Sequence, residues 1–309
     1  MISKGGITVN HKNFRGRELV LKTIDRQTTH RVPKGELVLD DEVIGNRLKT
    51  KSVGFDEKVE FVNHFGLDII SLSPKYSKNE DFFIDCAEME IDKWAQNTSL
   101  FTFVILDGAF EYGLRHFGFE DFLSMIMRDP QGTKNFISQV EKINLETACQ
   151  LADQGLDGII MADDIAFQNG LLIRPEHFRE IFLPSLERQV KVIEERQMIP
   201  FFHSDGNYLA VIEDIIDIGF KGIHCIDKRC GVNLKKLAPY GDKFCLWGHL
   251  DVDHLHSSQD ETLMTDLIDN IEDSTGFKGF ILGTNSGLFS GIDLDQLQNI
   301  YTNVDAACK

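Results

Sequence analysis

The chain has 309 residues, of which 42% are hydrophobic, and it carries a formal net charge of −17. This length suits one α/β barrel of roughly 250 residues with extensions, so we expect residues 1–309 to form a single domain. The acidic balance argues against nucleic acid as a partner, because phosphate binding needs a basic face.

The sequence shows no targeting or membrane segment. It contains no run of roughly 18 apolar residues, so we expect no transmembrane helix and no membrane association. The N-terminus lacks the apolar stretch of a signal peptide. The six cysteines form no CxxC pair, and their spacing fits neither a zinc ribbon nor a disulfide framework. Reduced thiols and a cytoplasmic location are the interpretation that these features favour.

Apolar segments recur along the chain after a leading helix, which is predicted over residues 16–27 ("GRELVLKTIDRQ"). Most of these segments are continuous rather than alternating, which is typical of strands buried on both faces of a parallel sheet. The predicted strands cover residues 34–39, 68–73, 102–108, 158–164, 200–206, 222–227, 244–251 and 279–285. The first of them is the weakest.

Amphipathic stretches lie between the predicted strands. Residues 207–219 have apolar positions at helical spacing and end at a glycine, which suits a helix C-terminus. Residues 174–197 and 261–276 behave likewise, and Pro184 should interrupt the former. Strands that alternate with helices predict an α/β fold, a single (β/α)8 TIM barrel with an N-terminal helical extension. A doubly wound open sheet is the alternative.

Polar side chains gather at the ends of the predicted strands, where a parallel barrel places its active site. Four residues near this rim are predicted to contact substrate, namely Glu36, Asp107, Phe202 and Asn285. A carboxylate such as Asp205 could instead cap the helix that follows its strand. Capping alone accounts poorly for acids and histidines placed within the last strand residues.

His203 and Asp205 form the most specific pattern, because residues i and i+2 of an extended strand point to the same side. Imidazole and carboxylate are good zinc ligands, and a divalent cation would relieve the repulsion among neighbouring acids. We therefore expect His203, Asp205 and Asp164 to be catalytic. The expected metal ligands are His203, Asp205 and Asp251, which ends the seventh strand. Without a metal, one of the acids is a candidate general acid.

Five segments follow one another along the chain: "RELVLKTIDRQTTHRVPKGEL" near the N-terminus, "MADDIAFQNGLLIRPEHFREIFLPSLERQV" in the centre, and then "FHSDGN", "YGDKFCLWGHLD" and "ILGTNSG". In this order they resemble the uroporphyrinogen decarboxylase superfamily over nearly the whole chain. The resemblance implies an α/β barrel and one of two activities. These are decarboxylation of uroporphyrinogen and methyl transfer to or from a corrinoid, sometimes with zinc.

The sequence departs from the decarboxylases of that superfamily. They carry an arginine-rich segment after the first strand, where this chain has the acidic "ELVLDDEVIGNRL". Their catalytic aspartate follows the second strand, where this chain reads "SLSPKYS". The resemblance therefore favours the corrinoid-dependent methyltransferase branch.

The superfamily's coenzyme M methyltransferases hold zinc with an H-x-C motif and a late cysteine. His203 matches the histidine, Asp205 replaces the first cysteine, and the late position falls near Asn285 or Ser286. This harder ligand set suits polarisation of an oxygen. The resemblance thus implies zinc-assisted methyl transfer from a small methylated donor, such as a methyl ether, to cobalamin or another corrinoid on a separate protein, as in an O-demethylase.

The corrinoid protein is expected as a partner because no "DxHxxG" segment is present here. The resemblance leaves a homodimer open. It also leaves open a decarboxylase or lyase that works without metal, methyl transfer from a corrinoid to a thiol, and a non-catalytic barrel that binds a tetrapyrrole or corrinoid.

Overall fold

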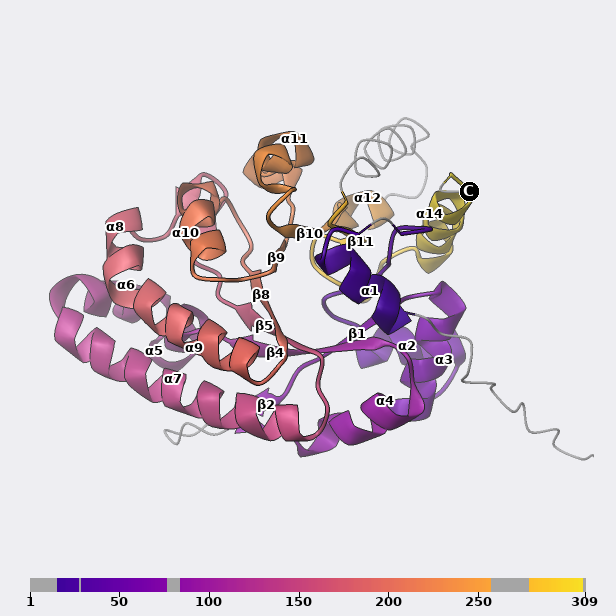
Figure 1. Cartoon of the computed structure of the whole chain (residues 1–309), viewed down its shortest axis with the longest axis horizontal. Coiled ribbons are helices and arrows are strands. Elements are labelled where there is room, and N and C mark those ends of the chain that lie inside the picture. Colours follow the sequence, from indigo (N-terminus) through magenta and orange to yellow (C-terminus); the bar gives the residue numbers. More distant parts are fainter. Residues whose placement is uncertain (1–15, 28, 77–83, 257–277, 308–309) are drawn as a thin grey trace, which may run out of the picture.

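A computed structural model describes residues 16–27, 29–76, 84–256 and 278–307. Its centre is a curled sheet of seven parallel strands in the order β1-β4-β5-β8-β9-β10-β11, with helices on its outer side (Figure 1). The strands are β1 (Ile69–Leu72), β4 (Phe101–Asp107), β5 (Gly158–Ala162), β8 (Ile199–His203), β9 (Gly222–His224), β10 (Cys245–Leu250) and β11 (Phe280–Thr284).

The helices and two small antiparallel hairpins complete the fold. The hairpins pair β2 (Lys75–Tyr76) with β3 (Ile84–Asp85), and β6 (Ala166–Phe167) with β7 (Gly170–Leu171). The helices are α1 (Gly16–Ile24), α2 (Asp41–Leu48), α3 (Phe55–Phe65), α4 (Ile91–Asn97), α5 (Ala109–Phe117), α6 (Phe119–Arg128), α7 (Pro130–Asp153), α8 (Pro175–His177), α9 (Leu183–Glu195), α10 (Ile212–Asp217), α11 (Leu234–Leu237), α12 (Val252–His256) and α14 (Leu294–Ala307).

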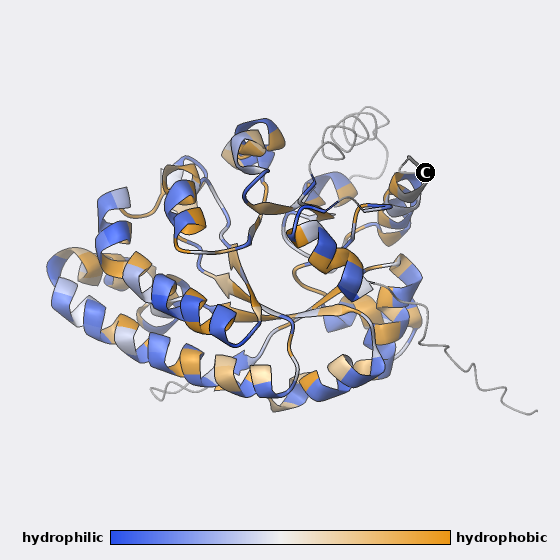
Figure 2. Cartoon of the chain, viewed as in Figure 1, coloured by the Kyte–Doolittle hydropathy of each residue, from blue (hydrophilic) through white to orange (hydrophobic). Residues whose placement is uncertain are grey.

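The core has two layers because successive strand residues face opposite sides of the sheet. Phe103, Phe201 and Trp247 belong to an inner cluster, whereas Phe202 joins the outer cluster beneath the helices. The strands and the buried faces of the helices are accordingly apolar, while the outward faces are hydrophilic (Figure 2). Burial on both sides explains why most strands read as continuous apolar runs.

Helix α1 confirms the predicted leading helix and covers one end of the inner cluster. Its Val20 and Ile24 pack within that cluster, and the Arg17 amide donates to the Ser99 carbonyl just before β4. Ser99 marks the N-terminal end of the strand, so α1 fills the N-terminal end of the curled sheet. The candidate functional site lies at the opposite end of the sheet, where the C-terminal ends of the strands lie.

The first predicted strand does not form. Residues 34–39 make only isolated parallel bridges, from Lys34 to Leu282 and from Leu39 to Leu288. The Gly35 amide donates to the Leu282 carbonyl over 3.0 Å, and the Asp68 amide donates to the Lys34 carbonyl over 2.7 Å. This segment therefore lies between β11 and β1 without regular pairing. The structure gives seven strands of a TIM-barrel-like α/β fold, in place of the eight expected.

The structure confirms two of the predicted helix features. Pro184 lies in the first turn of α9, directly after a π-helical turn over Phe178–Phe182, which confirms the interruption. Gly219 follows α10 with φ of +107°, as expected of a helix end. The helix predicted over residues 261–276 lies outside the described residues. In the part of the chain that the structure describes, no helix is long and apolar enough to span a membrane.

Candidate functional site

The ends of β5, β8 and β9 lie level with one another at the open end of the sheet. Ala162 pairs with His203, and His203 pairs with His224. His203 lies two residues after Phe201 of the inner cluster, so its ring emerges on the same side, one layer above the apolar core. The side chain is buried. A buried imidazole at this position faces the end of the sheet rather than the helices.

Three potential metal ligands meet here, namely Asp164, His203 and Asp205, whose ligand atoms lie within 4.8 Å of one another. The Nε2 atom of His203 is 3.6 Å from an oxygen of Asp164 and 3.9 Å from an oxygen of Asp205. Ligand atoms around a tetrahedral zinc, at about 2.1 Å from the metal, are about 3.4 Å apart. The three side chains therefore have nearly the spacing that such an ion requires.

The turn after β8 brings Asp205 to this position. The strand ends at His203, and the Asp205 amide donates to the Asp164 carboxylate over 2.8 Å. Gly206 follows with φ of +81°, and a Cβ there would lie 2.6 Å from the Ala166 backbone. The expected proximity of His203 and Asp205 is confirmed, but a glycine-dependent turn produces it and not a continued strand.

His224 fixes the orientation and tautomer of His203. Its Nε2 lies 3.0 Å from the Thr284 carbonyl, which can only accept, so His224 carries its proton there. Burial and the neighbouring His203 lower the pKa of His224 well below its usual value, so the ring is neutral. Its Nδ1 must then accept from His203 Nδ1 over 2.9 Å.

The consequence lies at the other nitrogen of His203. Because the Nδ1 nitrogen of His203 donates to His224, Nε2 is the nitrogen that faces the carboxylates of Asp164 and Asp205. A lone pair beside two anions is unfavourable unless a cation or a proton lies between them. This is the arrangement in which a histidine ligand is held by a hydrogen bond from its other nitrogen. His224 was not predicted as a site residue, although it ends β9, the strand next to that of His203.

The charges around Asp205 support the same interpretation. Desolvation raises the pKa of Asp205, His203 lowers it, and the nearby Asp164 raises it. The Cys225 thiol donates a hydrogen bond to the Asp205 carboxylate, and burial raises the pKa of this thiol well above its usual value. Cys225 therefore acts as a hydrogen-bond donor to Asp205 in this structure, and it is not one of the three potential ligands grouped around His203.

A cavity of about 570 Å³ lies next to Asp164 and Asp205. Its polar lining includes Glu111 and Asn285, whereas Ala166, Phe167, Leu172 and Val252 supply apolar surface. Desolvation raises the pKa of Glu111, and Asp164 raises it further. Glu111, from the helix after β4, was not predicted, because nothing in its local sequence separates it from an ordinary helix-surface acid.

Of two further predicted site residues, one lines this cavity and the other does not. Asn285 lines it, and its side-chain oxygen accepts from the Val252 amide over 3.2 Å. Asp107 ends β4, is buried, and pairs with Arg115 over 2.7 Å. Desolvation raises the pKa of Asp107 to about 7 although Arg115 opposes this shift. The predicted contacts of both residues with substrate stay predictions.

Asp251, the third predicted metal ligand, is not part of the group of three. Its carboxylate lies 3.4 Å from Nε of Arg229, which also pairs with Asp227 and Asp253. Asp251 directly follows β10, in which the backbone of His249 has a φ of +91°. The structure therefore gives Asp251 a guanidinium partner and gives Asp164 the place beside His203.

Two further residues lie away from the position that the sequence suggested. Phe202 is fully buried in the outer cluster, where its ring lies 5.3 Å from that of Phe220. Glu36 is also buried, and its carboxylate accepts from the Thr284 hydroxyl over 2.5 Å and from the Tyr301 hydroxyl of α14. Strand alternation turns Phe202 toward the helices, and hydrogen bonds hold Glu36 beside Thr284 and Tyr301, so neither side chain lines the cavity.

Residues 110–307 match the family model described as uroporphyrinogen decarboxylase (URO-D). The chain belongs to the uroporphyrinogen decarboxylase family. This confirms the resemblance found in the sequence. No curated protein sequence matches the chain at a significant level.

Solved structures show the same fold at low sequence identity. A methyltransferase from Methanosarcina mazei has a TM-score of 0.70 and 12% identity, with 96% of this chain and 98% of that chain covered. A protein described as a vitamin-B12-independent methionine synthase from Listeria monocytogenes has a TM-score of 0.55 and 13% identity, with coverage of 90% and 96%. At such identities the similarity establishes the fold alone.

Proposed function

We propose that this protein transfers a methyl group from a small methylated donor, such as a methyl ether, to the corrinoid of a separate protein, with the help of zinc. The observation that carries the proposal is the orientation of His203. Its Nε2 nitrogen is directed at Asp164 and Asp205 by the hydrogen bond to His224. The fold similarity to a methyltransferase supports the reaction class.

The donor set determines which metal chemistry is suitable. One imidazole and two carboxylates form a harder set than one with thiolates, which favours oxygen as the polarised atom. His203, Asp164 and Asp205 would hold the ion. Zinc supplies a Lewis acid when bound, and so improves the leaving group of the methyl donor.

The remaining residues position the donor and manage its proton. Asn285 projects from the loop after β11 into the cavity and can hydrogen-bond a polar group of the donor. Glu111, whose pKa is raised, can give a proton to the oxygen from which the methyl leaves. The methyl carbon passes to the acceptor, and the electron pair of the broken bond stays on that oxygen. The apolar side chains of Leu172 and Val252 reduce competing access of water.

A metal-independent decarboxylase or lyase has less support. An anionic substrate needs a cationic clamp, yet the cavity lining has acidic Glu111, Asp164, Asp205 and Asp227. The arginine in that lining, Arg229, is already paired with three carboxylates. An acidic cavity whose arginine is neutralised favours a neutral or cationic donor.

The test is reconstitution with zinc, a reduced free corrinoid as methyl acceptor and a panel of methyl ethers and related donors. Methylation is followed by the absorbance change of the cobalt centre. We expect His203→Ala to abolish both zinc binding and methyl transfer, whereas the exposed Ser138→Ala leaves both unchanged. Wild-type transfer by His203→Ala would refute the assigned role. Stoichiometric zinc without transfer from any donor would leave the metal site intact but contradict the reaction.

A further inference from the structure

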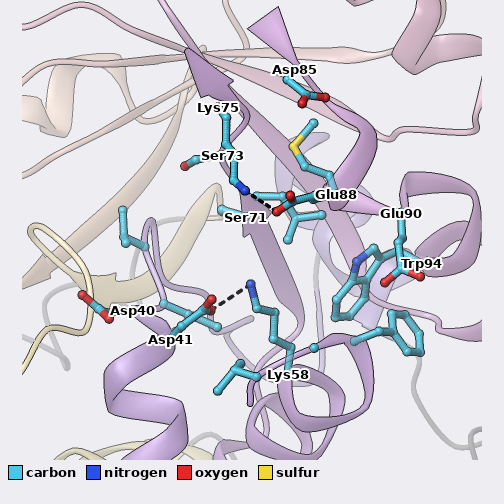
Figure 3. A pocket seen from close by; sticks show the side chains of 17 residues that line it. Asp40, Asp41, Lys58, Ser71, Ser73, Lys75, Asp85, Glu88, Glu90 and Trp94 are labelled. Carbon is cyan, nitrogen blue, oxygen red and sulfur yellow. Dashed lines mark ion pairs between the residues drawn. The ribbon is translucent and has the colours of Figure 1, made fainter. Parts of the chain in front are cut away.

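A second pocket, of about 450 Å³, lies beyond the end of β1. It is bordered by the start of α2, by α3 and α4, and by the hairpin of β2 and β3 (Figure 3). It shares no lining residue with the cavity beside His203. The proposed methyl transfer uses none of its side chains, so the pocket needs an explanation of its own.

The lysines of this pocket are already neutralised. Lys75 lies 2.5 Å from the carboxylate of Glu88, and Lys58 lies 3.0 Å from that of Asp41 (Figure 3). An anionic ligand would have to break one of these pairs. The positive charges in the lining therefore do not create an anion site.

The acidic charge exceeds the basic charge. Asp40 and Asp85 also line the pocket, and neither has an ion-pair partner among the described residues. Each uses one carboxylate oxygen for a nearby backbone amide, that of Glu42 over 2.7 Å and that of Ala87 over 2.9 Å. The charge of Lys75 is shared between Glu88 and the nearby Asp85, and the lining has five carboxylates against two lysines, which favours a cation.

An independent observation at the inner end of the pocket points to a ligand. Ser71 is only 8% exposed and lines the pocket, yet its Oγ has no hydrogen-bond partner among the residues that the structure describes. An unsatisfied buried hydroxyl costs about 1–3 kcal/mol, so such groups usually have a partner. Ser71 shares its side of β1 with Ile69 of the inner cluster, and its hydroxyl emerges just above that core.

The opposite wall is apolar. The rings of Phe55 and Trp94 lie 4.4 Å apart, and Met89 packs in the same outer cluster. All three residues line the pocket. An aliphatic chain could lie along this wall while its charged end meets a carboxylate.

We propose that this pocket binds a small aliphatic amine. Its ammonium groups pair with Asp85 and Asp40, the Ser71 hydroxyl supplies an acceptor, and the alkyl chain contacts Trp94 and Met89. The site works by charge and shape and does not depend on zinc or on the proposed methyl transfer. It adds a second ligand class to the molecule.

The test is calorimetric titration of the full-length protein with four five-carbon probes. These are 1,5-diaminopentane, pentylamine, 1,5-pentanediol and glutarate, which keep the chain and change the charge. We expect the diamine to bind best, pentylamine less well, and the diol and glutarate not at all at the same concentration. Affinity should fall as salt rises from about 0.05 to about 0.5 M. Absence of diamine binding, or tighter binding of glutarate, would overturn the proposal.

Variants connect any binding to the pocket. Asp85→Asn should weaken diamine binding by about tenfold, the usual effect of losing one charge-assisted hydrogen bond. Ser71→Ala should weaken it several-fold, while Ser138→Ala on the exposed face of α7 should leave it unchanged. His203→Ala should bind the diamine normally even where zinc binding is lost. Equal affinity in wild type, Asp85→Asn and Ser71→Ala would show that the amine binds elsewhere and refute the site.

Discussion

The substitution His224→Phe tests how the candidate metal site is organised. Phenylalanine keeps the ring but removes both hydrogen bonds, the 2.9 Å contact to His203 and the 3.0 Å contact to the Thr284 carbonyl. His203 then loses the acceptor that holds its proton on Nδ1. Loss of such a supporting partner typically lowers metal affinity by about 10–100-fold. This corresponds to about 1.4–2.7 kcal/mol of binding free energy.

The assay is zinc affinity, measured by competition with a chromophoric chelator, together with the thermal unfolding of the metal-free protein. His224→Asn is the conservative variant, because its amide can accept from His203 and donate to Thr284. It should recover part of the affinity. His249→Phe is the matched control, since this histidine is buried, its Nε2 has no hydrogen-bond partner in the described part of the chain, and it lies outside the group of three. Unchanged zinc affinity in a folded His224→Phe would refute the tautomer argument.

Two further predictions concern the turn after β8 and the buried carboxyl behind the sheet. Gly206→Ala should destabilise the protein and weaken zinc binding, because the new Cβ meets the Ala166 backbone at 2.6 Å. Gly118 has φ of +83° and ψ of 162°, and its added Cβ would have no described neighbour within 4 Å, so Gly118→Ala should cost only about 1–3 kcal/mol of backbone strain and leave zinc affinity intact. Equal losses in both variants, measured by denaturant unfolding and zinc titration, would contradict this. Burial raises the pKa of Glu36 from 4.5 to about 7, so the folded state binds the carboxyl proton more tightly than the unfolded state does. The free energy of unfolding therefore falls as the pH rises from about 4.5 through about 7. Glu36→Gln should therefore gain up to about 3 kcal/mol relative to wild type between pH 4.5 and 7.5, and a pH-independent difference in unfolding free energy would refute the shift.

Strand positions were predictable because burial on both faces produces continuous apolar runs. Residues 102–108 and 200–206 were recognised in this way and correspond to β4 and β8. Residues 34–39 were wrongly predicted to form a strand. Their composition is strand-like, but Pro33 precedes them without an amide hydrogen and Asp40 caps α2 directly after them.

The candidate site was predictable in part. Alternation placed His203 at the open end, and the composition of "HSDG" indicated a polar rim. The sequence could not show that Gly206 turns the chain so that Asp205 meets Asp164, because this contact joins two strands. Nor could it show that Arg229 neutralises Asp251. Side-chain direction at Phe202 was knowable, since it alternates with Phe201, and the interpretation as a mouth residue overlooked that constraint.

His224 illustrates a different limit. Its role follows from a hydrogen bond to another strand and from a carbonyl of β11, neither of which leaves a local sequence signal. Two histidines that end successive strands of a parallel sheet are neighbours in space, and that pattern is a usable sign in related chains. Zinc, the corrinoid partner and the methyl donor remain predictions that depend on the group around His203.

The most direct test of the central claim is metal analysis combined with X-ray absorption spectroscopy of the zinc-loaded protein. We predict one zinc per chain, bound by one imidazole nitrogen and oxygen ligands at about 2.0–2.2 Å, with no sulfur in its first coordination shell. Loss of the nitrogen signal in His203→Ala would assign it to this residue. Absence of stoichiometric zinc, or sulfur ligation at about 2.3 Å, would contradict the account.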